Sequence, residues 1–154
     1  MASDTVSSAL AEDVTLLRAE RDIMETLNKY SWAIDYGRED EYLDCFLETG
    51  VYQVKGFRTS TPKRVEGRAA LQAYFRARSP KSQQKHISTT PMIKVEGDHA
   101  VVETFFIGFN ADDGRPQLFL IGRYLDRMVR CPDGVWRIEE RDFEGENDPP
   151  ADKR

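Results

Sequence analysis

The sequence predicts an α+β fold in which helices come first and a curved, mostly antiparallel sheet follows. Apolar residues recur at helical spacing in three segments before Gln83, whereas long segments after it are rich in β-branched and aromatic residues. Short turns that contain glycine separate these later segments, which indicates consecutive hairpins. Because the strands carry apolar residues on both faces, we expect a cone-shaped α+β barrel, with a mixed sheet that three N-terminal helices close.

One domain accounts for most of the 154 residues. Residues 1–12 have no steady hydrophobic period and predict a mobile lead-in. Residues 144–154 contain two adjacent prolines and many charges, and they predict a flexible tail. The single domain is therefore expected over residues 13–143.

The first helix is expected to begin at Asp13 and to end near Gly37. Its apolar face repeats at helical spacings and consists of Leu16, Ile23, Leu27, Tyr30 and Ile34. At about 100° per residue, Asp35 lies just beyond the edge of this stripe and about 140° from Tyr30. The two side chains can therefore line one cavity only if the helix ends or unwinds at Gly37.

Two shorter helices and five strands complete the predicted order. The second helix is expected after Glu39 or Asp40, with Phe46 and Leu47 on its apolar face. A strand over 51–55 and a polar connection over 57–64 come next. The third helix, over 68–78, must end before Pro80. Four long strands follow, over 86–95, 100–110, 117–130 and 135–143.

Composition restricts the classes of partner. The chain has 22 Lys plus Arg against 27 Asp plus Glu, a net charge of -5, which offers no basic surface for nucleic acid. The sequence has no apolar run of about 18 residues, so no membrane span is predicted. The two cysteines lack the spacing of a zinc site or a disulfide scaffold, and no secretory signal is visible, so we expect a cytoplasmic protein. Neither HExxH spacing nor a glycine-rich phosphate loop occurs, so no metal site is predicted.

Several short motifs follow one another along the chain in a recognisable order. They are Tyr30-Ser-Trp-Ala-Ile-Asp35-Tyr-Gly, Lys85-His86-Ile, Gly122-Arg-Tyr124-Leu-Asp126 and Gly134-Val-Trp136-Arg-Ile138. Together they resemble the SnoaL-like branch of the nuclear transport factor 2-like superfamily, over about residues 16–143. This branch includes scytalone dehydratase, bile-acid 7α-dehydratases and hexachlorocyclohexane dehydrochlorinase, besides isomerases, polyketide cyclases and hydrolases.

The resemblance implies a catalytic pair of Asp35 and His86, assisted by Tyr30, with no metal or organic cofactor. Arg141 matches an arginine that some members carry on the last strand. The sequence departs from scytalone dehydratase and the bile-acid dehydratases on the strand after His86, where those proteins have a second histidine or an acid. Here that strand offers Phe105, Phe106 and Ile107, so the catalytic set is expected to be reduced.

A cofactor-free elimination is the chemistry that these residues predict. His86 can remove a proton beside a carbonyl, because imidazole titrates near neutral pH. Asp35 would fix the tautomer of the ring, and Tyr30 would donate to the developing enolate. Other residues are candidates for the wall of a hydrophobic substrate site, namely Trp32, Tyr52, Phe106, Phe119, Tyr124 and Arg141.

Each candidate also has a purely structural interpretation. Asp35 can be a solvated acid at a helix end, His86 a structural histidine at a strand start, and Tyr30 a core residue. Strand alternation turns Arg141 inward, where it can pair with Asp35 or with a substrate anion, although a solvated strand face would explain its charged neighbours. A further three residues are expected in charge pairs between strands or subunits, namely Arg123, Asp126 and Arg127.

The expected function is a cofactor-independent lyase of the dehydratase type that acts on a small hydrophobic cyclic or aromatic carbonyl compound. An isomerase, cyclase or hydrolase with the same pair is the first alternative. A non-catalytic binding or assembly subunit, such as the small subunit of a ring-hydroxylating dioxygenase, is the second. Apolar residues on the outer side of the sheet predict a homo-oligomer, either a dimer or a trimer.

Overall fold

The computed structural model describes residues 2–55, 63–78, 84–110 and 114–146. It confirms the α+β prediction: three helices and a six-stranded sheet account for nearly all of these residues. The helices are α1 (Ala2–Tyr36), α2 (Glu39–Asp44) and α3 (Arg68–Arg78). The strands are β1 (Phe46–Lys55), β2 (Lys63–Glu66), β3 (Lys85–Glu96), β4 (His99–Asn110), β5 (Gln117–Arg130) and β6 (Trp136–Gly145).

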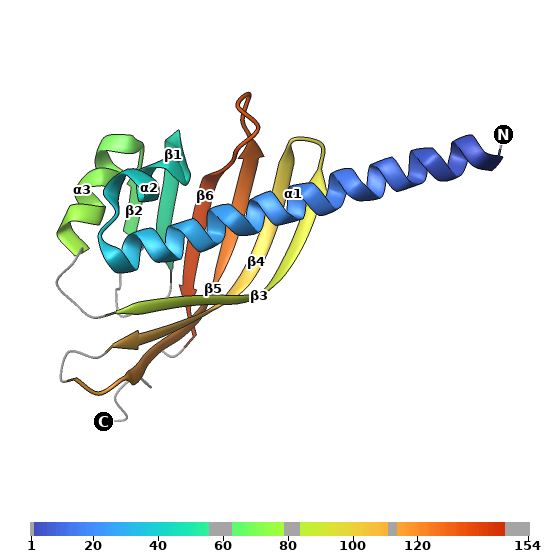
Figure 1. The fold of residues 1–154 in the computed structure, drawn as a ribbon. Coiled ribbons are helices and arrows are strands. Elements are labelled where there is room, and N and C mark those ends of the chain that lie inside the picture. Colours follow the sequence, from blue (N-terminus) through green and yellow to red (C-terminus); the bar gives the residue numbers. More distant parts are fainter. Residues whose placement is uncertain (1, 56–62, 79–83, 111–113, 147–154) are drawn as a thin grey trace.

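The strands form one mixed sheet in the order β2-β1-β6-β5-β4-β3. Strands β3 to β6 are consecutive antiparallel neighbours, as the short glycine-containing turns predict, while β1 runs parallel to β6. Strands β5 and β6 approach closely at Gly122, where a Cβ would lie 2.3 Å from the Glu144 carbonyl oxygen. Figure 1 shows the sheet strongly twisted, with α1 lying across one face and α2 and α3 beside β1 and β2.

The long helix α1 begins at Ala2 and not at Asp13, so it includes most of the segment that we expected as a lead-in. Residues 6–18 are exposed, and Figure 1 shows this part of α1 projecting beyond the sheet. Its alanines, leucines, glutamates and arginines are good helix formers, which favours a helix in this exposed part of α1. Its other end agrees with the prediction: Gly37 has φ of 71°, and α1 stops one residue before it.

The second half of α1 covers the concave face of the sheet. Ile23, Leu27 and Tyr30 are almost fully buried there, together with Met128 and Ile138 of the sheet. A polar contact fixes the helix in place, since the buried hydroxyl of Thr26 donates to the carbonyl of Trp136 at 2.7 Å. The stripe predicted from the sequence is thus the face that forms the core.

Two predicted boundaries differ from the structure. Phe46 and Leu47 begin β1 instead of extending α2, because the backbone already pairs with β6 there: the Ile138 amide donates to the Cys45 carbonyl at 2.8 Å. The polar connection predicted over 57–64 includes the start of β2 at Lys63. Its other residues lie outside the described part of the chain, as does most of the predicted tail, whose first two residues extend β6.

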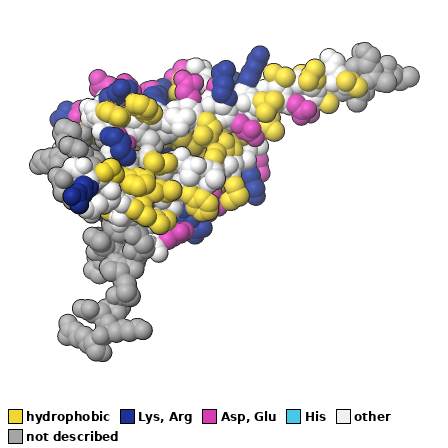
Figure 2. Space-filling model, turned by 60° about the horizontal axis from the view of Figure 1, so that its bottom comes forward, with side chains coloured by type: hydrophobic (Ala, Val, Ile, Leu, Met, Phe, Trp, Pro, Cys, Tyr) yellow, Lys and Arg dark blue, Asp and Glu magenta, His cyan; other side chains and the backbone are white. Residues whose placement is uncertain are grey.

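Exposed apolar side chains collect on the outer face of β3, β4 and β5. One row crosses the three strands, because Ile87 is paired with Ile107 and Ile107 with Ile121. Phe105 is 56% exposed beside this row. Figure 2 shows a broad area of hydrophobic side chains on the body of the molecule. Charged pairs between strands flank it. Arg123 and Arg127, which were predicted to form charge pairs, are paired with Glu144 and Glu140.

No helix in the described ranges has the length and apolar character that crossing a membrane requires.

Candidate active site

Asp35 and His86 form the centre of the candidate site. Asp35 lies in the last turn of α1, and His86 is the second residue of β3, which packs against that helix. One carboxylate oxygen, Oδ1, lies 2.5 Å from His86 Nδ1, and the other, Oδ2, accepts the backbone N–H of His86 at 2.9 Å. The exposed fraction of each side chain is only 5 to 6%. The pair predicted from residues 51 positions apart is therefore in direct, buried contact.

The contacts of the imidazole indicate which nitrogen carries the proton. Nδ1 faces a carboxylate and acts as the donor, which leaves Nε2 with a free lone pair in the neutral ring. Nε2 lies 3.4 Å from Nη2 of Arg78, a group that can only donate. Both neighbours thus favour the same tautomer, and in it the basic nitrogen points away from Asp35.

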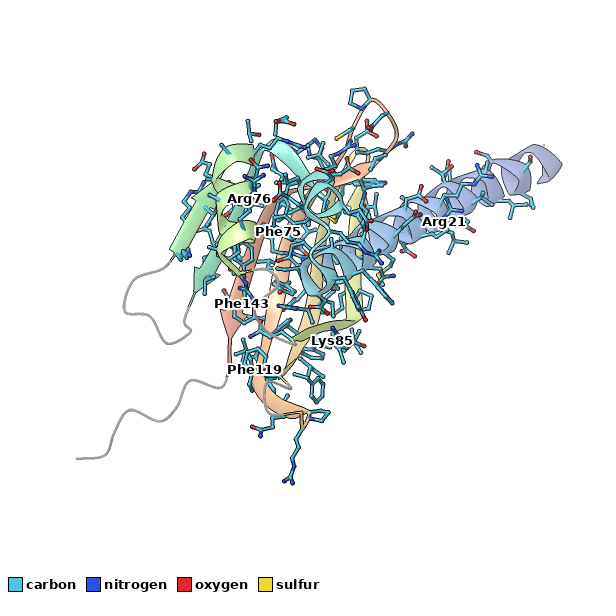
Figure 3. All side chains as sticks on the ribbon, turned by 60° about the vertical axis from the view of Figure 1, so that its left-hand side comes forward. Arg21, Phe75, Arg76, Lys85, Phe119 and Phe143 are labelled. Carbon is cyan, nitrogen blue, oxygen red and sulfur yellow. The ribbon has the colours of Figure 1, made fainter. Side chains whose placement is uncertain are left out.

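A cavity of about 210 Å³ opens on the Nε2 side of the ring. Its described lining is mostly apolar and aromatic, with a few polar groups: Tyr52, Val54, Arg78, Gln84, His86, Phe106, Phe119, Leu120, Tyr124 and Phe143. Figure 3 shows Phe119 and Phe143 well away from Arg21 of α1, toward the opposite end of the molecule. An apolar cavity with few polar groups is the usual form of a small-molecule site.

The aromatic lining was largely predicted. Tyr52, Phe106, Phe119 and Tyr124 all line the cavity together with His86. The rings of Phe106 and His86 have centroids 5.4 Å apart, so Phe106 supports the imidazole from the side. Burial raises the pKa of Tyr52 and of Tyr124 well above the ordinary value, so both hydroxyls keep their protons at neutral pH and can donate.

Tyr30 lies behind this wall and is not part of the described lining. Its exposed fraction is 1%, and its ring packs edge-on against Tyr124 with centroids 6.2 Å apart. Burial raises the pKa of Tyr30 to about 12, although the nearby positive charge of Arg141 opposes the rise. The helical wheel placed Asp35 and Tyr30 about 140° apart, and the structure agrees with it: Asp35 faces the site, whereas Tyr30 faces the core.

Arg141 points inward, as strand alternation predicted, but its partner is neither Asp35 nor open solvent. Its Nε and Nη2 donate to the two carboxylate oxygens of Asp126 at 2.7 and 2.8 Å, and both side chains are fully buried. The guanidinium also lies 4.0 Å from the ring centroid of Tyr30 and 4.2 Å from that of Tyr124. The pairing of Arg141 with Asp35 is thus corrected, because Asp126 is its partner across β5 and β6.

Trp32 lies outside the cavity. It is 54% exposed and stacks on Tyr36 with ring centroids 5.2 Å apart. It borders a shallow surface depression that also includes Lys85 and reaches the outer side of the Asp35 and His86 pair. The placement follows from helical geometry, since Trp32 is about 140° from Leu27 on the wheel, opposite the buried stripe.

Sequence reasoning missed Arg78, the cation next to Nε2. A usable signal existed, because Arg78 follows the buried residues Leu71 and Tyr74 by seven and four positions and so shares their face of α3. The register of α3 against β3 could not be read from the sequence, however, because the two elements meet only in the folded chain. No group of three metal-ligating side chains occurs within the described residues. What the site offers is a base, an oriented acid, buried hydroxyls and a guanidinium, a set suited to proton transfer.

Comparison with known proteins agrees with this architecture. The model of the SnoaL-like domain family matches residues 15–142. No curated protein matched the sequence. An NTF2-like protein with a cystatin-like fold from Novosphingobium aromaticivorans is 25% identical, with a TM-score of 0.77, over 90% of this chain and 88% of that one.

Two further structures from the same organism share the fold at lower identity. A candidate scytalone dehydratase is 20% identical, with a TM-score of 0.72, over 87% of this chain and 88% of its own. The β subunit of a candidate aromatic-ring-hydroxylating dioxygenase is 22% identical, with a TM-score of 0.73, over 86% of this chain and 92% of its own. These similarities establish an NTF2-like fold.

Proposed function

Because the chain belongs to the SnoaL-like domain family, we propose that it is a cofactor-independent lyase of the dehydratase type. The substrate class is a small hydrophobic cyclic or aromatic compound that carries a hydroxyl group β to a carbonyl. The supporting observation is the position of His86, whose Nδ1 is held by Asp35 while Nε2 faces an aromatic cavity. A histidine with this orientation is a base ready to take a proton from a bound molecule.

The proposed reaction is an elimination with one proton carrier. His86 Nε2 takes the proton on the carbon next to the carbonyl, and the electron pair of that C–H bond moves to form an enolate. Asp35 accepts the Nδ1 hydrogen bond and stabilises the imidazolium. The enolate then expels the β-hydroxyl, which takes the proton from Nε2 and leaves as water. The products are an α,β-unsaturated carbonyl compound, water and neutral His86.

The enolate oxygen needs a donor on the wall of the cavity. Tyr30 was the predicted donor, but its position behind Tyr124 leaves that role to groups that reach the cavity. Tyr52 and Tyr124 are buried, protonated hydroxyls on the lining, and a preorganised donor of this kind acts on charge that develops during the reaction. We therefore assign the donor role to this pair of tyrosines.

The same base and acid can serve an isomerase, a cyclase or a hydrolase. These reactions differ in what the carbanion or the activated nucleophile reacts with. A panel of cyclic β-hydroxy ketones and β-hydroxy thioesters separates these outcomes. Formation of a conjugated product is followed by its ultraviolet absorbance, and mass spectrometry reports loss of water, rearrangement or hydrolysis. Water loss is expected, and its absence alongside another product would replace the dehydratase assignment.

The matched pair of variants for this panel is His86→Ala and His99→Ala. The chain has two histidines, and His99 is exposed at the start of β4. His86→Ala is expected to lower kcat by about 10²- to 10⁴-fold, the usual contribution of a general base, whereas His99→Ala should leave it unchanged. Equal activity of the two variants would contradict the proposal.

A non-catalytic assembly subunit is the second candidate. The exposed apolar face of β3, β4 and β5 favours it, because such a surface suits a protein partner. The fold is also that of a dioxygenase β subunit. This candidate predicts no turnover on the panel and no effect of His86→Ala on assembly.

A further inference from the structure

We infer that Arg78 is an anion-binding residue, and that the substrate or ligand of the cavity carries a carboxylate or another acidic oxygen beside its hydrophobic ring. This inference deepens the proposed function by naming the charge of the ligand, and it rests on that function only for the identity of the cavity as the substrate site. The observations behind it concern the guanidinium itself, its neighbours and the other arginines of the chain.

The guanidinium of Arg78 lacks a carboxylate partner among the described residues. Nη1 donates to the hydroxyl of Tyr74 at 2.6 Å, and Nη2 lies 3.4 Å from His86 Nε2. Asp35 is connected to Arg78 only through the imidazole of His86, because it contacts Nδ1 on the other side of the ring. A guanidinium has five N–H donors, so Arg78 has further donors that meet no carboxylate among the described residues and can serve a bound molecule.

Other arginines have anionic partners, whether they are buried or exposed. Arg141 is held by both oxygens of Asp126, and Arg137 is paired with Asp44 and Asp133. Arg76, two residues before Arg78 and on the surface, forms two hydrogen bonds with Glu39. Arg78 differs, because it is partly buried, lines the cavity and is left without an ion pair in the described part of the chain.

The surroundings of Arg78 add a second positive charge. The ammonium of Lys63 lies 4.6 Å from the ring centroid of Tyr74, whose hydroxyl Arg78 contacts. Removing a charge from water is unfavourable unless an opposite charge and hydrogen bonds replace the lost solvent. A bound carboxylate would supply both, and the planar guanidinium matches its two oxygens. The remainder of the wall is aromatic and apolar, which fits the ring of the same molecule.

The position of Arg78 also connects binding with catalysis. A proton that arrives on His86 Nε2 lies next to the guanidinium, which is an unfavourable arrangement of two positive charges. An anion bound to Arg78 would offset this repulsion. The acidic group of the substrate would therefore make His86 a better proton acceptor at the moment when the substrate is in place.

Equilibrium binding tests the inference without relying on turnover. The probes are benzoate and benzamide, which have nearly the same shape and differ in charge, titrated calorimetrically up to about 10 mM, well above the 1 mM dissociation constant that corresponds to about -4 kcal/mol. The wild-type protein is expected to bind benzoate at least about tenfold more tightly than benzamide, the contribution of a charge-assisted hydrogen bond. Arg78→Gln should abolish this preference.

The control is Arg76→Gln, which makes the same change of charge on the same helix but outside the cavity. It should retain the preference for benzoate, and circular dichroism and thermal unfolding should show both variants folded. Two further arms use Arg78→Lys, expected to retain part of the preference, and His86→Gln, expected to retain binding.

The inference is overturned if the wild type binds the two probes equally, binds neither at these concentrations, or keeps its preference in Arg78→Gln. Failure of the proposed function alone gives a different result. Benzoate would then bind through Arg78, but the hydroxy-carbonyl panel would show no turnover that depends on His86.

Discussion

Asp35 holds His86 at two points, through the imidazole Nδ1 and through the backbone N–H at the start of β3. The two carboxylate oxygens therefore fix both the ring and the strand that carries it. Because the side chains are almost fully buried, the contact joins the end of α1 to the cavity. The burial of Asp35 is inconsistent with the alternative interpretation of a solvated acid at a helix end.

Asp35→Asn should lower kcat strongly while it keeps the fold. The amide has nearly the same shape, but it can present an N–H to Nδ1 and thereby favour the tautomer with the proton on Nε2, which blocks the base. We expect a loss of about 10²- to 10⁴-fold in kcat with a smaller effect on KM. Steady-state kinetics on the substrate found with the panel provide the measurement.

Asp40→Asn is the matched control for Asp35→Asn, because Asp40 is an exposed acid on the neighbouring helix α2. Its kinetics should equal those of the wild type. Should Asp35→Asn retain full kcat, the pair would be structural and the base would have to be sought elsewhere on the cavity wall.

The buried pair of Arg141 and Asp126 is expected to stabilise the protein and not to take part in the reaction. Asp126→Asn leaves a buried guanidinium without a counter-ion, so the free energy of unfolding should fall by about 3 to 5 kcal/mol. Replacing both residues, as Arg141→Met with Asp126→Leu, removes the two charges together and should recover most of that loss. Urea unfolding of Asp126→Asn, of the single changes Arg141→Met and Asp126→Leu, and of the double variant measures these differences. Simple additivity of the two single changes would contradict a coupled pair.

The sequence identified the features of the site that local patterns encode. The end of α1 followed from a glycine after the apolar stripe, and the inward direction of Arg141 followed from strand alternation. The helical wheel also placed Tyr30 and Asp35 on different faces of α1. The buried position of Asp126 could have been found in the same way, because it shares a face of β5 with Tyr124 and Met128.

Other features depended on how separate elements meet. Arg78 at the end of α3 and His86 at the start of β3 are eight residues apart and come within side-chain reach in the fold, and no periodicity within either segment predicts that contact. Trp32 shows the opposite case, in which the aromatic side chain suggested a lining residue although its position on the helical wheel is on the outer face. Local periodicity thus predicted the direction of a side chain more reliably than its partner.

Tyr30 should make stability depend on pH in the alkaline range. Its pKa in the folded protein is about 12, above the ordinary value of 10.0, because burial disfavours the charged form. As pH rises from about 10 to about 12, the unfolded chain loses this proton while the folded protein keeps it, so unfolding becomes more favourable. The stability linked to Tyr30 is fully present below pH 10 and is lost as pH rises through this window.

Tyr30→Phe isolates this effect. Between pH 8 and pH 11 the wild type should lose about 1 kcal/mol more unfolding free energy than the variant, because a phenylalanine has no proton to release. Tyr36→Phe, a change at an exposed ring, should leave the pH dependence of the wild type intact. Denaturant unfolding at the two pH values gives the result, and parallel curves for wild type and Tyr30→Phe would contradict the buried position of this hydroxyl.

The outer face of β3, β4 and β5 should hold copies of the chain together. We propose a homo-oligomer through this face, because the row of Ile87, Ile107 and Ile121 lies beside the half-exposed Phe105. Phe105→Asp places a charge in the middle of the contact and should shift the protein toward monomers. Leu10→Asp, at an exposed position on the projecting part of α1, should not. Sedimentation velocity distinguishes the species: a monomeric wild type would remove the proposal, whereas an oligomer unaffected by Phe105→Asp would assign the contact to another surface.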